Sequence, residues 1–443
     1  MERAAQMIIY AENISNRLRY VSEFVASELL NERITLTNDK EVFSQHIGIK
    51  INYSQDKVAD DEFHLPPHSL LFENYISAQQ INCTLVSGKK VFFQTTTGDF
   101  HFDVLAATFY LLTRYEEYLP HEKDQYGRFP HTASLAFKEG FLHIPLINCW
   151  LDEFKEALQK KNPSFQFHHK TFSFLPTYDI DMAWKYKHKG FWRNIGSGFK
   201  SIFKNEKPNF GDRIAVLQES KKDPYDIYEW LDALHLYCRM KPYYFFLVAE
   251  EQKAYDKNIP PSNEQLQQLI AYHSGRGIVG IHPSWQSGDD PKLIKQELGW
   301  LEFITGNKIK HSRQHYIRLN LPNTFRELIS AGIEKDFSIG YGSTNGFRAS
   351  VASSFFWYDL EKEASTDLVL FPFCFMDANA YYEEKLTPHQ AFNELMNYYY
   401  QIKKVNGMMI TIWHNNFLST EKQFSPWRDM YEIFLKEEVY WDS

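Results

Sequence analysis

Residues 177–184, TYDIDMAW, place two carboxylates two positions apart at the end of an apolar run, residues 171–176. Side chains at positions i and i+2 of a strand share a face, so Asp179 and Asp181 should project together from a strand's C-terminal end. Two like charges this close need a cation or a shared proton to relieve their repulsion. A solvated acidic loop could have the same sequence. The pair therefore indicates a functional site only if other segments place complementary polar or charged side chains beside it.

After this stretch, strand-like and helix-like segments alternate. The other predicted strands are residues 241–249, 277–283, 308–319, 338–341, 367–375 and 408–413. The predicted helices are residues 224–239, 262–274, 291–304, 322–331, 387–405 and 425–438, with capping boxes Ser262/Gln265 and Thr387/Gln390. Residues 192–208 are rich in Gly, Ser and Lys and are interpreted as a loop. This order predicts the α/β class and a distorted TIM-like (β/α)7 barrel, although an open doubly wound sheet would show the same alternation.

Residues 1–168 are predicted to form a smaller mixed α/β domain of unknown function, and residues 169–443 the barrel. In the first part we expect a strand at 7–11, a helix at 14–30, a hairpin around Gly88-Lys89 and a helix at 102–118. Residues 114–131 are dense in charged and aromatic side chains. They could form a binding loop, or a polar loop that closes this domain against its neighbour.

Composition excludes several classes of protein. The net charge of −8 argues against a nucleic-acid partner. No stretch approaches the roughly 20 apolar residues of a membrane span, and no secretion signal is seen, so we expect a cytoplasmic protein. Cys83, Cys149, Cys238 and Cys374 lack metal-site spacing and are interpreted as reduced thiols. No nucleotide-binding glycine loop is present, and the oligomeric state stays open.

In a barrel, the C-terminal strand ends would bring chemically active side chains to one mouth. They are Asp179 and Asp181, His282 in GIHPSW, Arg313 and His315 in SRQH, Arg348 in GFRAS, and His414 and Asn415 in IWHNN. A single histidine near a strand is more often structural, but several imidazoles and carboxylates at strand ends are harder to dismiss. Asp181, His282 and His315 together suit a divalent transition ion that keeps open positions for water and substrate.

TYDIDMAW resembles the first motif, commonly TFDDG, of the polysaccharide deacetylases of carbohydrate esterase family four. The resemblance implies that Asp179 is the catalytic base and Asp181 a metal ligand. The family's second motif has two histidines four apart on a helix. Here Gln286 stands four residues after His282, so His315 would have to replace the second histidine.

GFRAS resembles the motif whose arginine orients the base, which implies that role for Arg348. WHN resembles the final motif, which implies that His414 is the general acid. The whole chain, including LLTRYEEYLP and GRF, is similar to bacterial proteins that join an uncharacterised N-terminal domain to a divergent deacetylase barrel.

The resemblance implies a zinc-dependent hydrolase that removes the acetyl group from an N-acetylated sugar, glycan precursor or other small molecule. A metal activates water and polarises the carbonyl, while a carboxylate and an imidazole move protons. Arg313, Trp285, Trp413 and Asn415 are the candidate substrate contacts, with core packing as the alternative for the tryptophans. Two other functions stay open, namely a metal-independent, allantoinase-like amidase and a non-catalytic glycan-binding barrel.

Overall fold

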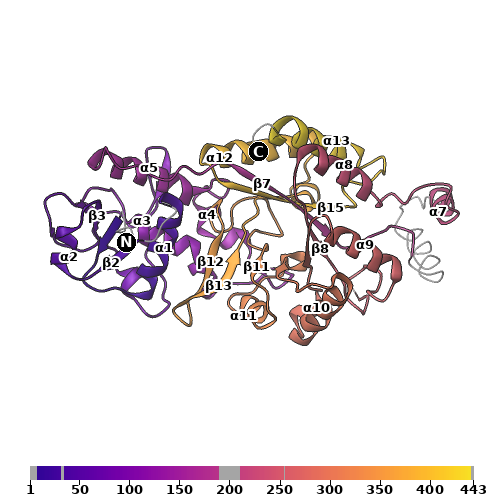
Figure 1. Ribbon diagram of the computed structural model, residues 1–443, viewed down its shortest axis with the longest axis horizontal. Coiled ribbons are helices and arrows are strands. Elements are labelled where there is room, and N and C mark those ends of the chain that lie inside the picture. Colours follow the sequence, from indigo (N-terminus) through magenta and orange to yellow (C-terminus); the bar gives the residue numbers. More distant parts are fainter. Residues whose placement is uncertain (1–6, 31–33, 189–209, 254, 441–443) are drawn as a thin grey trace.

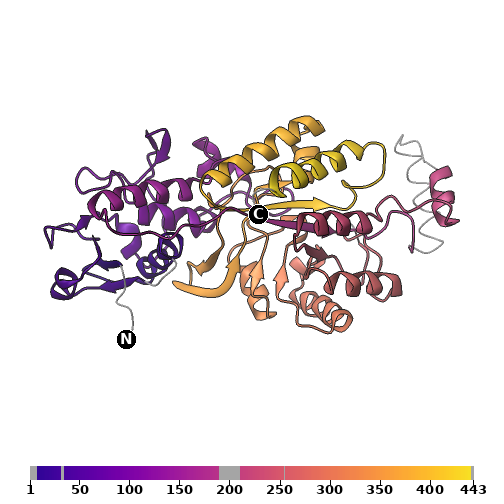
Figure 2. The ribbon, with the colours of Figure 1, turned by 45° about the horizontal axis from the view of Figure 1, so that its top comes forward.

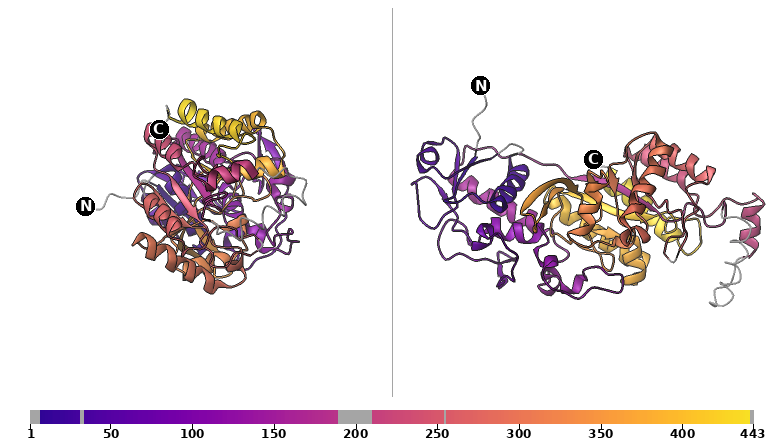
Figure 3. Two further views of the ribbon diagram at one scale, coloured as in Figure 1. Left: turned by 90° about the vertical axis from the view of Figure 1, so that its right-hand side faces the viewer. Right: turned by 90° about the horizontal axis from the view of Figure 1, so that it is seen from below.

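The computed structural model describes residues 7–30, 34–188, 210–253 and 255–440. The predicted loop at 192–208 lies outside the described residues. The molecule is elongated: N-terminal elements occupy one end, a large sheet the middle, and α7 (Phe210–Leu217) the other end (Figures 1 and 3). Among the helices of these ranges, none combines the length and apolar character that spanning a membrane requires. The four cysteines are free thiols.

The N-terminal region contains a small parallel sheet in the order β2-β1-β3-β4. Its strands are β1 (Met7–Tyr10), β2 (Thr35–Thr37), β3 (Ile49–Asn52) and β4 (Phe63–His64). The predicted hairpin is confirmed in shorter form, as β5 (Thr84–Val86) paired with β6 (Lys89–Val91). The helices are α1 (Asn16–Leu29), α2 (Lys40–Gln45), α3 (Val104–Leu112), α4 (Leu135–Lys138) and α5 (Leu146–Lys161).

The helix predicted at 102–118 is wrong in its second half. It ends at Leu112, and a separate 3-10 turn covers Tyr115–Tyr118. Between them Arg114 has φ 54°, in the left-handed region that an α-helix cannot pass through.

The second sheet has nine strands in the order β12-β13-β11-β10-β9-β8-β7-β15-β14. The strands are β7 (Ser173–Ile180), β8 (Tyr243–Phe246), β9 (Ile278–Ile281), β10 (His311–Ser312), β11 (Lys335–Asp336), β12 (Phe355–Asp359), β13 (Ala364–Leu370), β14 (Phe375–Met376) and β15 (Met408–His414). All neighbours pair in parallel except β12, which is antiparallel to β13. The mixed α/β class is therefore confirmed.

Helices follow β7, β8, β9, β10, β14 and β15 along the chain and cover the sheet. They are α8 (Tyr228–Cys238), α9 (Glu264–Ser274), α10 (Pro291–Thr305), α11 (Asn323–Ser330), α12 (Pro388–Lys404) and α13 (Ser425–Ile433). In Figure 2 the yellow α12 and α13 lie on the opposite side of the central strands from α9 and α10. The predicted capping box of α12 is confirmed. The cap of α9 is Asn263 rather than the predicted Ser262, because Asn263 accepts hydrogen bonds from the first backbone N–H groups.

The paired strands end at β12 and β14 and do not themselves form a ring. The main chain between β13 and β14 makes a bond to a neighbouring strand at each of its ends. The N–H of Phe371 donates to the carbonyl of Asp336 on β11 (2.8 Å), and that of Cys374 donates to Ile410 on β15 (3.2 Å). These two bonds continue the pairing of β13 with β11 and of β14 with β15, so the described strands form an open sheet.

Three strand predictions need correction. The strand predicted at 367–375 is split, because β13 ends at Leu370 and the separate strand β14 begins at Phe375. The strand predicted at 308–319 is wrong beyond Ser312, because Tyr316 and Ile317 have φ of 59° and 51° and cannot continue a strand. The strand predicted at 338–341 is replaced by β11 at Lys335–Asp336. It ends there because the Asp336 carboxylate accepts a hydrogen bond from the Ser338 N–H (2.8 Å), which takes the place of a ladder bond.

The alternation of β7 determines where its acids point. Tyr178 and Ile180 belong to the large core that includes the covering helices. Leu175, four positions before Asp179, packs against the separate small cluster that contains Phe245. Since alternate residues share a face, Asp179 lies on the side of that inner cluster. It also pairs in register with His414 of β15, the neighbouring strand.

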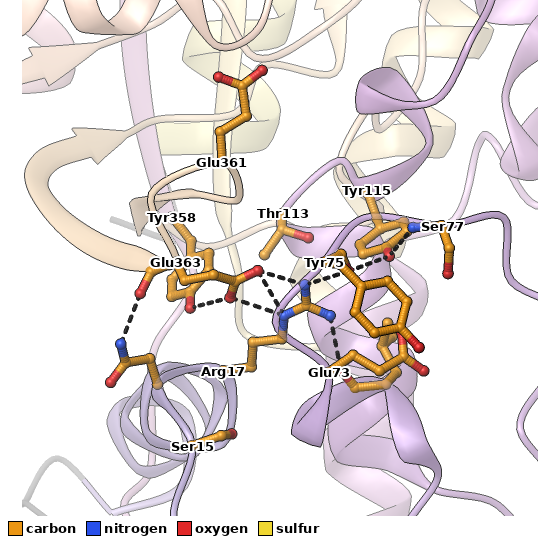
Figure 4. Close-up of polar contacts among 12 residues, drawn as sticks. Ser15, Arg17, Glu73, Tyr75, Ser77, Thr113, Tyr115, Tyr358, Glu361 and Glu363 are labelled. Atoms are coloured by element: carbon orange, nitrogen blue, oxygen red, sulfur yellow. Dashed lines mark hydrogen bonds and ion pairs between the residues drawn. The ribbon is translucent and has the colours of Figure 1, made fainter.

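A buried arginine joins the N-terminal region to the second sheet (Figure 4). Arg17 on α1 pairs through Nη2 with Glu363 Oε1 (2.5 Å) in the turn between β12 and β13. Its guanidinium also donates to the carbonyls of Leu70 and Tyr75, each at 2.9 Å. Tyr20 adds a hydrogen bond to the Phe356 carbonyl (2.6 Å). The two regions therefore share a polar interface as well as a continuous apolar core.

Candidate active site

Three side chains from different parts of the sheet converge. Asp181 follows β7, His282 follows β9, and His315 lies in the turn after β10. One ligand atom from each lies within 4.8 Å of the others. Nε2 of His282 is 3.2 Å from Asp181 Oδ1, and Nε2 of His315 is 3.6 Å from Oδ2. We call these three residues the ligand cluster.

The surroundings of the ligand cluster fit a divalent metal ion. Nδ1 of His282 lies 2.6 Å from the Arg313 carbonyl, which can only accept, so Nδ1 carries a proton and donates it. Nδ1 of His315 lies 3.0 Å from Asp256 Oδ1. Histidine ligands usually anchor their second nitrogen in this way. In addition, Asp181 Oδ1 is buried and has no hydrogen bond, so it is an acceptor left unused by the protein.

The close contacts of the ligand cluster shift the pKa values of His315 and Asp181. Burial disfavours a charged His315, but the carboxylates of Asp181 and Asp256 raise its pKa to about 9. Burial likewise disfavours ionised Asp181, yet His315, His282 and His414 lower its pKa well below the ordinary value. The Asp181 side chain is 33% exposed, so the cluster opens to solvent. A cation bound here would replace the proton that now balances these charges.

Asp179 lies beside the cluster and is fixed by Arg313. Nη1 of Arg313 donates to Asp179 Oδ1 at 2.8 Å. The same guanidinium donates through Nε to the Phe337 carbonyl and lies 4.5 Å from the centre of the Phe245 ring. The other oxygen of Asp179, Oδ2, is 3.9 Å from His282 Nε2. Arg313 therefore contacts the buried Asp179, whereas the sequence analysis predicted that it would contact the substrate.

His414 approaches the cluster from β15. Its Nδ1 is 2.6 Å from Asp377 Oδ1, and its backbone N–H donates to Asp377 Oδ2. Its Nε2 lies 3.8 Å from Asp181 Oδ2. Burial would lower the pKa of His414, but the Asp377 carboxylate, with help from Asp181 and Asp179, raises it to about 10. The ring therefore carries a proton on the nitrogen that faces the cluster.

Sequence reasoning missed two carboxylates that hold these imidazoles. Asp377 follows β14 directly, so the rule that selected Asp181 could have found it. Asp256 lies in a loop after β8 and carried no comparable signal.

Arg348 lies away from Asp179. Its Nε and Nη2 donate to the two oxygens of Glu117 in the N-terminal region, at 2.9 and 2.6 Å. Its Nη1 donates to the Gly340 carbonyl at 3.1 Å. The arginine in contact with the candidate base is therefore Arg313.

The remaining candidates divide between the core and the edge of the site. Trp413 is fully buried and packs 4.5 Å from the Tyr431 ring, because it faces the helices. Asn415 donates to the Met182 carbonyl (2.9 Å), so its side chain fixes the main chain after β7. Trp285 is half-buried, and its backbone N–H donates to Asp256 Oδ1 at 2.8 Å. Of these three, only Trp285 borders the ligand cluster.

The chain matches one protein family over its N-terminal region and two solved structures at low similarity. A family of unknown function, DUF7033, matches residues 7–163, a range that ends before the site begins. No curated protein shows a significant match to the chain. A structure described as a polysaccharide deacetylase from Mycobacterium smegmatis matches with TM-score 0.37 and 13% identity, over 61% of this chain and 86% of its own. The polysaccharide deacetylase Bc1974 from Bacillus cereus gives 0.30 and 11%, over 62% and 87%. Similarity at this level carries no argument about function.

Proposed function

We propose that this chain is a metal-dependent hydrolase that removes the acetyl group from an N-acetylated sugar or glycan precursor, on a distorted (β/α)7 barrel. One observation carries the proposal. The ligand cluster of Asp181, His282 and His315 lies beside a carboxylate held by an arginine and an imidazole held by a carboxylate. Amide hydrolysis needs these three components: an electrophilic centre, a base and an acid.

In this proposal the ligand cluster holds one divalent ion, and zinc suits its two nitrogen donors and one oxygen donor best. When bound, the ion supplies a Lewis acid that activates water and polarises the amide carbonyl. The exposed part of Asp181 leaves a path for ion and substrate. His282 and His315 keep their orientation because each anchors Nδ1.

Asp179 acts as the general base. Arg313 occupies Oδ1, so Oδ2, which faces His282, is the oxygen available to accept a proton from the attacking water. The buried guanidinium keeps the carboxylate in one orientation, which places that oxygen on the side of the cluster.

His414 acts as the general acid. Its protonated Nε2 faces the cluster from the neighbouring strand, and it donates this proton to the amine nitrogen as the C–N bond breaks. The proton taken up by Asp179 balances the one given by His414, and the products are acetate and a free amine. Asp377 stabilises the imidazolium and fixes the tautomer.

Metal content and acetate release test the proposal together. The purified chain should release acetate from members of a panel of N-acetyl hexosamines and their short oligomers. Chelation should abolish release, and added Zn²⁺ should restore it. His282→Ala should lose bound metal, whereas the matched control His389→Ala, on the exposed side of α12, should retain it.

Acetate release that survives complete metal removal would instead support the metal-independent amidase. A metal-loaded protein that releases acetate from no member of the panel would contradict the deacetylase.

A further inference from the structure

Four aromatic side chains form a continuous group beside the ligand cluster. They are Tyr126, Tyr255, Trp285 and Tyr316, and we call them the aromatic platform. The ring centres of Tyr255 and Trp285 are 4.3 Å apart, and Tyr126 lies 5.6 Å from Tyr316 and 5.9 Å from Trp285. Each of the four side chains is only half-buried, whereas aromatic side chains of the core are covered.

The platform adjoins the ligand cluster through two connections. Tyr316 directly follows His315, and the two rings are 4.7 Å apart. Trp285 donates its backbone N–H to Asp256 Oδ1, the same oxygen that lies 3.0 Å from His315 Nδ1. A molecule that presents a reacting group to the cluster would therefore have its neighbouring atoms over these rings.

Tyr126 comes from the N-terminal region, in a tightly held turn. Asp124 Oδ1 accepts from the backbone N–H groups of Tyr126 and Arg128, both at 2.9 Å. Asp124 Oδ2 pairs with Arg128 Nε at 2.7 Å. The Arg128 guanidinium lies 4.6 Å from the centre of the Tyr126 ring. These bonds fix the ring before any ligand binds, which lowers the entropy lost on binding.

The same turn also holds Tyr316. Arg128 Nη1 donates to the Tyr316 carbonyl at 2.7 Å. Tyr316 has φ 59°, an uncommon conformation for a bulky residue that costs energy and persists only where its surroundings enforce it. A side chain at position 342 would collide with Arg128, and glycine stands there. The N-terminal region therefore positions two of the four rings.

We propose that the aromatic platform binds the apolar face of a pyranose ring next to the N-acetyl group, so that the N-terminal region completes a glycan-binding subsite. The four rings are tilted against one another by 39–88°, and the guanidinium groups of Arg128 and Arg318 lie 4.6 and 4.4 Å from the ring centres of Tyr126 and Trp285. Half-exposed aromatic rings with such polar groups beside them suit a sugar ring that has one C–H face and hydroxyls at its edge. This inference rests on the proposed deacetylase function. It gives the N-terminal region a role in substrate selection.

Calorimetric titration with the N-acetylglucosamine disaccharide and trisaccharide tests the subsite. The Asp179→Asn protein serves as parent so that the probe is not hydrolysed. Adding Tyr126→Ala should weaken binding about fivefold to tenfold, the size expected for one aromatic contact. Tyr126→Phe, which keeps the ring, should bind like the parent. The matched control Tyr400→Ala removes an exposed tyrosine of α12 and should also bind like the parent.

Unchanged affinity in Tyr126→Ala, or no binding of either sugar by the parent, would overturn the subsite. Acetate release by the wild-type chain is measured separately. Release together with unaltered Tyr126→Ala binding would refute the platform alone. Binding that depends on Tyr126 without release from any sugar would refute the hydrolase and leave the subsite standing.

Discussion

The ligand cluster and the charge network around Glu117 are both buried groups of opposite charges, yet they differ in how completely they are paired. Both oxygens of Glu117 accept hydrogen bonds from Arg348, and Oε1 also accepts one from Arg114. Its side chain is 2% exposed. In the ligand cluster, Asp181 is 33% exposed and its Oδ1 has no hydrogen bond.

This difference distinguishes two uses of buried charge. Around Glu117 the protein pairs both carboxylate oxygens with its own guanidinium groups, which suits a connection between two regions. Around Asp181 it leaves an acceptor unused, which indicates a place for something from outside. Substitutions in the first should therefore change stability, and substitutions around the second should change the rate.

Asp179→Asn should have the largest effect. Arg313 can still bond to the amide oxygen, but the base is lost, so acetate release should fall by roughly 10²–10⁴-fold. Bound metal, measured by elemental analysis, should stay at the wild-type level because Asp179 is not in the ligand cluster. A rate near wild type would remove Asp179 from the mechanism.

Glu117→Ala should act on stability. It leaves two buried guanidinium groups without their carboxylate, which costs about 3–5 kcal/mol in such sites. The urea concentration at the midpoint of unfolding should drop accordingly. The control is Glu122→Ala, an exposed acid of the same loop, which should unfold like the wild type. Equal midpoints for both variants would show that the network does not stabilise the fold.

Acid should weaken the same network. Burial alone would raise the pKa of Glu117, but Arg348 and Arg114 lower it to about 2. The folded form thus holds its proton less tightly than the unfolded chain, whose pKa is near 4.5. The stabilisation is complete above pH 4.5 and is lost as pH falls towards 2, by about 3 kcal/mol. Glu117→Gln should lose less stability than wild type over this window. If the wild type and Glu117→Gln lost equal stability between pH 4.5 and 2, the lowered pKa of Glu117 would be contradicted.

His414→Ala should give the smallest of these effects, and it should depend on the leaving group. An amine must be protonated as it leaves, so amide hydrolysis should slow by roughly 10²-fold. An activated aryl acetate leaves without a proton and should be affected much less. Rates for both substrates decide the matter, because an equal loss on both would make His414 a positioning residue only.

Local patterns predicted much of the second half of the chain. The capping box of α12 is encoded within one turn and was predicted correctly, as was the start of α10 at residue 291. The end of β10 was missed because the left-handed backbone of Tyr316 is enforced by Arg128, far away in the sequence. The strand propensity of residues 308–319 does not depend on that contact and so could not predict it.

In the site, too, local sequence patterns do not predict contacts between residues that lie far apart in the chain. The acids of TYDIDMAW and the histidine of IWHNN were selected because each follows an apolar strand, and the structure brings their side chains together. The short motif GFRAS predicted that Arg348 orients Asp179, but Arg348 pairs with Glu117, 231 positions earlier. Arg313 contacts Asp179 instead, 134 positions away. Partners at such separations follow from the packing of strands and regions.

The pairing of β7 with β15 has a consequence for biosynthesis. Asp179 and His414 are neighbours in register, although more than half of the chain separates them. A nascent polypeptide on the ribosome holds Asp179 and the ligand cluster long before it contains His414. Joining strands so distant also costs loop-closure entropy, so this pairing should form late. We therefore expect the unfinished chain to be inactive, with catalysis beginning only when the last strand adds to the sheet.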